Sequence, residues 1–103
     1  MNGYHQIQEF PVTVTGKAIN EIEVTGAKFV EVLQVGLSEC GAPTAWAIVE
    51  LSETAERSLE KDFAIIHIYK TGFEMAGNSD ELQYLNSFEY DGETWCHAFW
   101  EVL

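Results

Sequence analysis

The sequence predicts a mainly β fold, a compact antiparallel β-sandwich or barrel of six to seven strands with one short helix across it. Apolar residues recur with period two through most of the chain, in runs rich in Val, Ile and aromatic residues. Gly, Pro, Asn and Asp separate these runs, as turn residues do between strands. The 103 residues suffice for one domain, residues 1–103, with its own hydrophobic core.

Four strands are predicted in the first half of the chain. The first can be interrupted at Pro11, because proline has no backbone N–H to donate to a sheet. The second alternates Glu21 and Glu23 with Ile22 and Val24, which is typical of a strand with one buried and one solvated face. The predicted strands are residues 4–15, 18–25, 28–35 and 44–51.

A short helix is predicted after the fourth strand, where the period changes. Ser52 is a suitable N-cap, and residues 53–61 consist largely of helix formers. Glu56 with Glu60 and Arg57 with Lys61 are like-charged pairs four residues apart. We therefore expect this helix to be short and weak.

Three further strands are predicted after the helix, at residues 62–71, 83–90 and 94–103. Residues 72–80 form the longest expected loop, since this segment is rich in Gly, Asn and Ser. Asp91-Gly92 joins the last two strands, and this dipeptide suits the positive backbone angles of a tight hairpin turn.

Two of these strands carry a histidine flanked by aromatic residues on one face. The opposite face is apolar in both, with Ala64, Ile66 and Ile68 in one strand and Cys96, Ala98, Trp100 and Val102 in the other. The histidine-bearing faces hold Phe63, Ile65, His67 and Tyr69, and Trp95, His97, Phe99 and Glu101. Each such face is either a second core layer or a binding surface.

No catalytic or metal-binding motif is evident. His5, His67 and His97 lack the spacing of metal ligands, so we interpret them as packed or hydrogen-bonded structural residues. Cys96 and His97 point to opposite sides of one strand and cannot form a nucleophile–base pair. The sequence therefore predicts a protein that is not an enzyme, with no catalytic residues, metal or cofactor.

The cysteine pattern and the N-terminal residues predict a cytoplasmic location. Cys40 and Cys96 are too few for a disulfide framework, so free thiols in a reducing compartment are expected. The first ten residues carry no apolar run preceded by positive charge, so no signal peptide is expected, and no apolar stretch is long enough for a membrane helix. We expect no membrane partner.

The strongest functional signal is charge. Seventeen acidic residues against five basic ones give a net charge of −12, which repels nucleic acid and attracts basic protein surfaces. Direct nucleic-acid binding is not expected, because phosphate contacts require several Lys or Arg side chains. Three acidic groups, each also explicable as solubilising charge, are candidates for binding a partner: Glu21 and Glu23; Glu53, Glu56 and Glu60; and Glu89, Asp91 and Glu93.

Four segments together resemble an uncharacterised family of small bacteriophage-encoded β-rich proteins. They are residues 26–36, 41–49, 68–72 and 84–99, and the resemblance covers about residues 19–101. Departures include Lys70 at a position where a small residue is expected and an additional aromatic residue at Trp100. The resemblance implies a phage or prophage origin, hence the host cell cytoplasm, and carries over no functional residue.

Two functional hypotheses follow. The first is a phage-encoded interaction protein that blocks a host factor, in counter-defence or host takeover, by presenting its acidic residues to a basic, nucleic-acid-handling site. The alternative is a small-ligand-binding protein that sequesters a nucleotide-like signalling molecule in an aromatic pocket, at the interface of a homo-oligomer if one forms. The pocket residues would be Trp46, His67, Tyr69, Trp95, His97 and Phe99.

Overall fold

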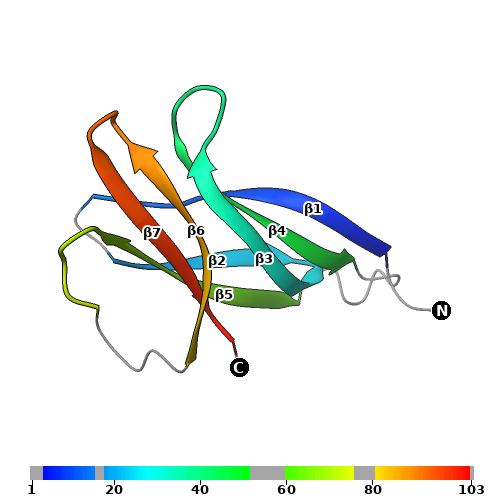
Figure 1. Cartoon of the computed structure of the whole chain (residues 1–103). Coiled ribbons are helices and arrows are strands. Elements are labelled where there is room, and N and C mark those ends of the chain that lie inside the picture. The colour runs from blue at the N-terminus through cyan, green and yellow to red at the C-terminus, as the bar shows by residue number, and fades with distance from the viewer. Residues whose placement is uncertain (1–3, 16–17, 52–59, 76–80, 103) are drawn as a thin grey trace.

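The structure, a computed structural model, describes residues 4–15, 18–51, 60–75 and 81–102, and in these ranges it contains seven β-strands and no helix. The strands are β1 (Tyr4–Pro11), β2 (Ile19–Thr25), β3 (Ala27–Leu37), β4 (Pro43–Leu51), β5 (Lys61–Lys70), β6 (Leu82–Tyr90) and β7 (Thr94–Glu101). They form a three-stranded sheet, β1-β4-β3, and a four-stranded sheet, β2-β5-β7-β6 (Figure 1). Every paired strand is antiparallel, so the predicted mainly β antiparallel fold is confirmed.

The strand boundaries follow the sequence pattern closely. β1 ends at Pro11, where an interruption was predicted, and β3 extends beyond the predicted residues 28–35 at both ends. The helix predicted at residues 53–61 falls mostly on residues 52–59, which lie outside the described residues. Its predicted end is wrong, because Lys61 pairs with Thr25 as the first residue of β5.

The hairpin predicted at Asp91-Gly92 is confirmed. Asp91 has a φ of 56° and Gly92 a φ of 81°, the pair of positive angles that a type I′ turn requires. The Asp91 carboxylate accepts hydrogen bonds from the backbone N–H groups of Glu93 and Thr94. The turn places β7 between β5 and β6, at the centre of its sheet.

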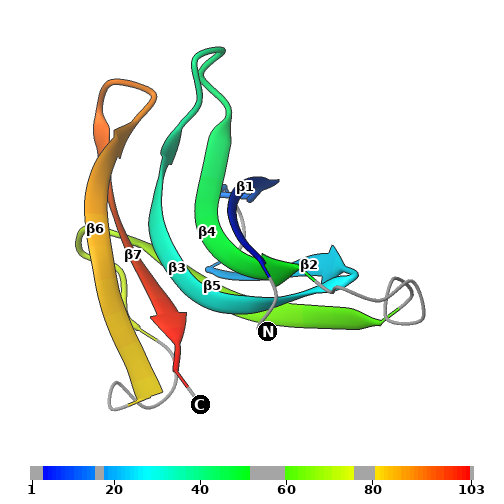
Figure 2. The same ribbon diagram turned by 90° about the vertical axis from the view of Figure 1, so that its right-hand side faces the viewer.

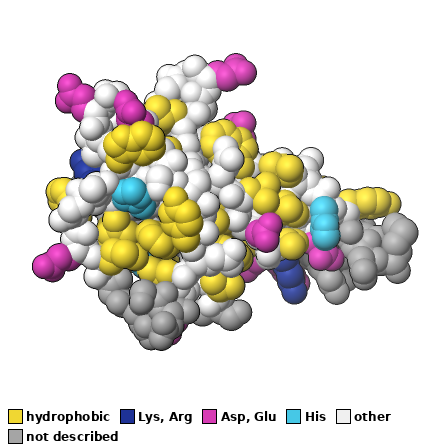
Figure 3. Space-filling model, viewed as in Figure 1, with side chains coloured by type: hydrophobic (Ala, Val, Ile, Leu, Met, Phe, Trp, Pro, Cys, Tyr) yellow, Lys and Arg dark blue, Asp and Glu magenta, His cyan; other side chains and the backbone are white. Residues whose placement is uncertain are grey.

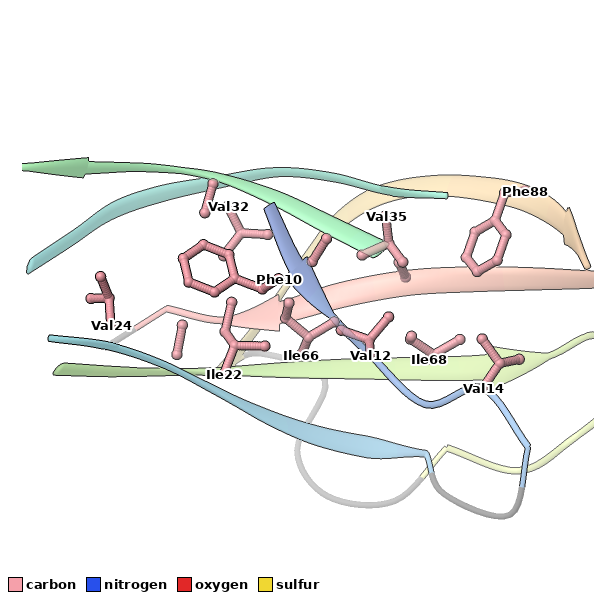
Figure 4. Close-up of a cluster of buried hydrophobic side chains, with 14 of the residues drawn as sticks. Phe10, Val12, Val14, Ile22, Val24, Val32, Val35, Ile66, Ile68 and Phe88 are labelled. Atoms are coloured by element: carbon pink, nitrogen blue, oxygen red, sulfur yellow. The ribbon is translucent and has the colours of Figure 1, made fainter. Parts of the chain in front are cut away.

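The hydrophobic core lies between the two sheets. Val32 and Val35 of β3 face Ile66 and Ile68 of β5 (Figure 4). Ala98 of β7 is fully buried in the same core, and so is Cys96. The apolar faces predicted for β5 and β7 therefore lie on the core, except at Val102, which follows β7 and is 43% exposed.

Bulges bend the strands so that the two sheets wrap around this core. The pairing of β3 with β4 shifts register between Phe29 and Glu31 and again between Val32 and Gln34. Both strands curve along their length in Figure 2. A third shift, between Tyr84 and Asn86, lies in the pairing of β6 with β7.

Asparagine side chains join the two sheets at their edges. Asn86 of β6 donates to the backbone oxygen of Val35 in β3 at 2.6 Å and accepts from its N–H at 2.9 Å. Asn20 of β2 makes the same pair of bonds with the backbone of Thr13, just beyond β1. The fold is therefore a sandwich of two sheets whose edges are joined by hydrogen bonds made by the side-chain amides of Asn20 and Asn86.

Candidate functional site

The candidate site is the outer face, by which we mean the side of the four-stranded sheet that points away from the core. Strand alternation places the residues that flank the core positions of β2, β5 and β7 on this side. The register then aligns them in rows, for example Ile19, His67, Phe99 and Tyr84 across the four strands. The outer face consists of Ile19, Glu21, Glu23, Phe63, Ile65, His67, Tyr69, Tyr84, Ser87, Glu89, Trp95, His97, Phe99 and Glu101.

Phe99 lies at the centre of an aromatic group on this face. Its ring meets Tyr84 at a centroid distance of 5.5 Å and Tyr69 at 6.2 Å, in both cases edge to face. Such pairs contribute about 0.5–1.5 kcal/mol each beyond the area that they bury. Three strands therefore supply one rigid aromatic group.

His67 is part of the packed structure of the outer face. Its side chain is buried, with Nε2 2.8 Å from Glu101 Oε2 and Nδ1 3.0 Å from Tyr69 Oη. Because an ionised carboxylate only accepts hydrogen bonds, Nε2 donates to Glu101. Both ring nitrogens are thus engaged, which confirms the predicted structural role of this histidine.

His97 is held in the same way by hydroxyl groups. Its Nδ1 lies 2.6 Å from Ser87 Oγ and its Nε2 lies 2.6 Å from Thr71 Oγ1. The Ser87 hydroxyl also lies 2.7 Å from Tyr84 Oη, which extends the chain of hydrogen bonds across β6. This network fixes the ring of His97 and the edge of the aromatic group.

The two sequence interpretations of the histidine-bearing faces each apply to part of the outer face. His67 and Tyr69 are each only 5% exposed and act as a second packed layer. Tyr84 and Trp95 are 54% and 51% exposed, so they present apolar surface to solvent. Figure 3 shows hydrophobic side chains gathered around one histidine over β6 and β7.

Acidic residues lie at two corners of the outer face. Glu21 and Glu23 are exposed on β2, opposite Ile65 and Phe63 of β5. Glu89, opposite Trp95, stands near the hairpin that carries exposed Asp91 and Glu93. These two groups are diagonally opposite, because Glu23 pairs with the start of β5 and Glu89 lies beyond its end. The aromatic group lies between them.

The other predicted acidic residues are placed only in part. Glu60 is exposed, and its backbone oxygen accepts from the N–H of Gly26, at the same corner as Glu23. Glu23 lies 3.6 Å from Lys61, in an exposed pair that contributes little to stability. Glu53 and Glu56 lie outside the described residues. The structure therefore brings two of the three predicted acidic groups to one face, a juxtaposition that the sequence did not predict.

Trp46 does not join the other predicted pocket residues. It lies on the outer side of the three-stranded sheet, where its indole Nε1 donates to Glu9 at 3.2 Å. Its strand neighbours Ala45 and Ala47 are fully buried in the core, so its side chain points away from the four-stranded sheet. The prediction of a single pocket containing Trp46 together with Trp95 and Phe99 is therefore wrong. The alternation of apolar residues predicts which face of a strand a side chain lies on, but it does not predict which sheet the strand joins.

Several residues of the outer face and its margin were not predicted as site residues. Tyr84, Ser87 and Thr71 complete the aromatic and hydrogen-bonding networks. The predicted hairpin could have identified Ser87. Once Glu89 is paired with Trp95, counting two residues back along β6 and two forward along β7 pairs Ser87 with His97. The same counting fails for Tyr84, because the bulge before Asn86 shifts the register of the pairing.

Within the described ranges, no three His, Cys, Asp or Glu side chains come together in a way that could hold a metal ion. Among the same residues, no helix has the length and apolar character needed to cross a membrane. Both cysteines are free, as predicted, with Cys40 exposed and Cys96 buried.

Comparisons with protein-family models, with curated proteins and with solved structures found no match. The phage resemblance stays a prediction.

Proposed function

We propose that this protein is a non-enzymatic interaction protein that docks a basic protein surface onto the outer face of its four-stranded sheet. The observation that carries the proposal is the arrangement of exposed aromatic residues between two acidic corners. Protein interfaces combine an apolar, aromatic centre with a polar rim, and aromatic side chains supply much of the binding energy. The outer face has both parts on one rigid sheet.

The charge of the chain selects the partner. With a net charge of −12, the protein attracts a basic surface over long range and accelerates its association. Glu21 and Glu23 stand on the same side of β2, at a spacing of about 6.6 Å for residues two apart on a strand. A row of negative charges at this spacing resembles the phosphates of a nucleic acid. We therefore propose that the partner is a nucleic-acid-handling protein, blocked by mimicry of its substrate.

The proposed setting is a host cell infected by a phage. In that setting the partner is a host factor, and occupying its basic site serves counter-defence or host takeover. Nothing in this role requires a reaction, a cofactor or direct contact with nucleic acid.

The small-ligand alternative is less well supported by the geometry. His67 and Tyr69 are buried, and Trp46 belongs to the other sheet. Among the predicted pocket residues, Trp95 remains most open to solvent, at a position opposite Glu89. An acid beside the exposed ring suits a basic side chain of a protein better than the phosphate of a nucleotide.

The proposal is tested by capture from a bacterial lysate at two salt concentrations, using the wild type and Glu21→Lys/Glu23→Lys. We expect a captured protein that is lost at high salt and is lost with the double variant at low salt. Native mass spectrometry of the purified protein tests the alternative, because a retained nucleotide-like molecule would favour it. Capture that is indifferent to both salt and the double variant would contradict docking at this face.

A further inference from the structure

The outer edge of β1 is open in the part of the chain that the structure describes. β1 is the edge strand of its sheet and pairs only with β4. The edges of β3 and β6, by contrast, are joined through Asn86 and Val35. An open strand edge presents unpaired N–H and C=O groups to which another strand can add.

The register of β1 shows which of its backbone groups point outward. The N–H of Val12 donates to the backbone oxygen of Pro43, the first residue of β4. The pairing of β1 with β4 from Tyr4 to Pro11 has no register shift. Because antiparallel bonds involve alternate residues, the even-numbered residues of β1 bond to β4. The N–H and C=O groups of His5, Ile7 and Glu9 therefore point away from the sheet. Pro11, which has no N–H, occupies another of these outward positions.

The sequence of β1 is complementary to itself when two copies run antiparallel. Pairing about Ile7 places Ile7 opposite Ile7, Gln6 opposite Gln8, His5 opposite Glu9 and Tyr4 opposite Phe10. Each pair is apolar, amide with amide, imidazole with carboxylate, or aromatic with aromatic. Pairs of these kinds stabilise neighbouring strands.

We propose that two copies of this chain form a symmetric dimer by antiparallel pairing of β1 with β1, about a two-fold axis at Ile7. Two three-stranded sheets then become one continuous sheet of six. His5, Ile7 and Glu9 are the residues whose outward backbone groups pair in this arrangement, each with its mate across the axis. A closed two-fold contact of this kind uses the same surface on both copies.

The side chains around β1 are placed for this pairing. Glu9 accepts from the Trp46 indole at 3.2 Å, and His5 lies 3.8 Å from Glu50. In the dimer, His5 of one copy would lie opposite Glu9 of the other. The Trp46–Glu9 and His5–Glu50 contacts would then form one row of polar side chains across the dimer. On the opposite side of the strand, Gln8 donates to Gln6 at 2.7 Å, so the two amides already share one face.

β1 carries few of the features that usually protect an edge strand: Glu9 is its one acid, and Pro11 stands at its end, outside the proposed contact. Ile7 is 62% exposed at the centre of the proposed contact, and so is Tyr4 near its end. Glu9 is the only acid of β1, in a chain that carries seventeen, and the strand has no lysine. Charged residues, bulges and prolines along the edge keep strands apart in other β proteins, and residues 4–10 of β1 contain no proline.

The dimer does not depend on the proposed function, since it uses the three-stranded sheet and leaves the outer face free. Salt distinguishes the two. Each copy carries a charge of −12, so screening weakens the repulsion between copies and favours the dimer. The same screening weakens docking to a basic partner.

The test is sedimentation velocity of the full chain over a broad concentration series, at low and high salt. We expect a dimer that is strengthened by salt. Ile7→Pro removes an N–H that points away from β4, so it should abolish the dimer while leaving the fold intact. Ile7→Lys should also abolish it, by placing two like charges at the axis. Val30→Lys adds the same charge at an exposed position of β3 and is expected to stay dimeric.

Cross-linking tests the register of the pairing. Directly opposed residues of a hydrogen-bonded antiparallel pair have Cα atoms about 5.5 Å apart, within the range of a disulfide. In a Cys40→Ser background, Ile7→Cys should oxidise to a covalent dimer and Thr25→Cys should not. A monomeric wild type at every concentration and salt, or a dimer that survives both Ile7→Pro and Ile7→Lys, would overturn the proposal. If Ile7→Pro fails to fold, Ile7→Lys and the cross-link decide.

Discussion

The side-chain amide of Asn86 makes the two hydrogen bonds to the backbone of Val35 that a neighbouring strand would otherwise make. Its nitrogen donates to the Val35 oxygen at 2.6 Å, and its oxygen accepts from the Val35 N–H at 2.9 Å. Val35 is fully buried, so these backbone groups have little access to water. One amide thus closes the seam between the two sheets.

Asn86→Ala should therefore destabilise the protein by about 2–4 kcal/mol, because it removes two hydrogen bonds and leaves a buried N–H and C=O unpaired. Chemical denaturation followed by tryptophan fluorescence measures the change. Gln83→Ala, an exposed amide on the same strand, is the matched control and should shift stability by less than about 0.5 kcal/mol. Equal effects of the two substitutions would show that the seam contributes nothing.

Trp100 should be a major contributor to stability, as its place in the central strand β7 predicts. Its side chain packs against the core, while its indole Nε1 has no hydrogen-bond partner among the described residues. We expect Trp100→Ala to cost about 3–5 kcal/mol. Trp100→Phe should cost much less, because it keeps a ring in place and removes the unpaired N–H. A melting temperature unchanged in Trp100→Ala would contradict this placement.

The two cysteines should differ strongly in reactivity. The hydrogen bond from the Ser38 side chain, with support from the backbone of Ala42, lowers the pKa of the Cys40 thiol, whereas burial raises the pKa of Cys96. At neutral pH, Cys40 therefore has a larger thiolate fraction than an ordinary thiol and should be alkylated first. Labelling with iodoacetamide, read by mass spectrometry, should modify one site in the native protein and two in denaturant. Ser38→Ala should slow the first reaction.

The hydrogen bonds of His67 and His97 predict that the fold needs no metal. Every ring nitrogen of these two residues already has a protein partner. Elemental analysis of the purified protein should find no stoichiometric transition metal, and a chelator should leave the melting temperature unchanged. One zinc ion per chain would revive a metal-site interpretation.

The strands were predictable because each is encoded locally. Glu21, Ile22, Glu23 and Val24 alternate in burial as the period-two pattern requires, and Asp91-Gly92 sets its own turn. The order of strands in the sheets was not predictable from such patterns, since it depends on contacts between distant segments. The bulge before Asn86 was also not predictable from local sequence, because Asn86 bonds to the backbone of Val35 in β3, far away in the chain.

The candidate site was predictable only as separate parts. Alternation placed His67 and Trp95 on equivalent faces of their strands, but burial of one and exposure of the other depends on neighbouring strands. It also could not assign Trp46 to the other sheet. The joining of two acidic groups and the aromatic group on one face is a consequence of the strand order β2-β5-β7-β6.

Docking of a basic partner at the outer face is tested most directly by the association rate of the captured partner. Two variants with the same change in net charge are compared by surface plasmon resonance: Glu21→Lys/Glu23→Lys on the outer face and Glu31→Lys/Glu39→Lys at exposed positions outside it. The face variant should associate about tenfold or more slowly at low salt, with the control much closer to the wild type. Trp95→Ala should matter less to this rate and act on dissociation. Equal slowing of both charge variants, or no slowing of either, would contradict docking at this face.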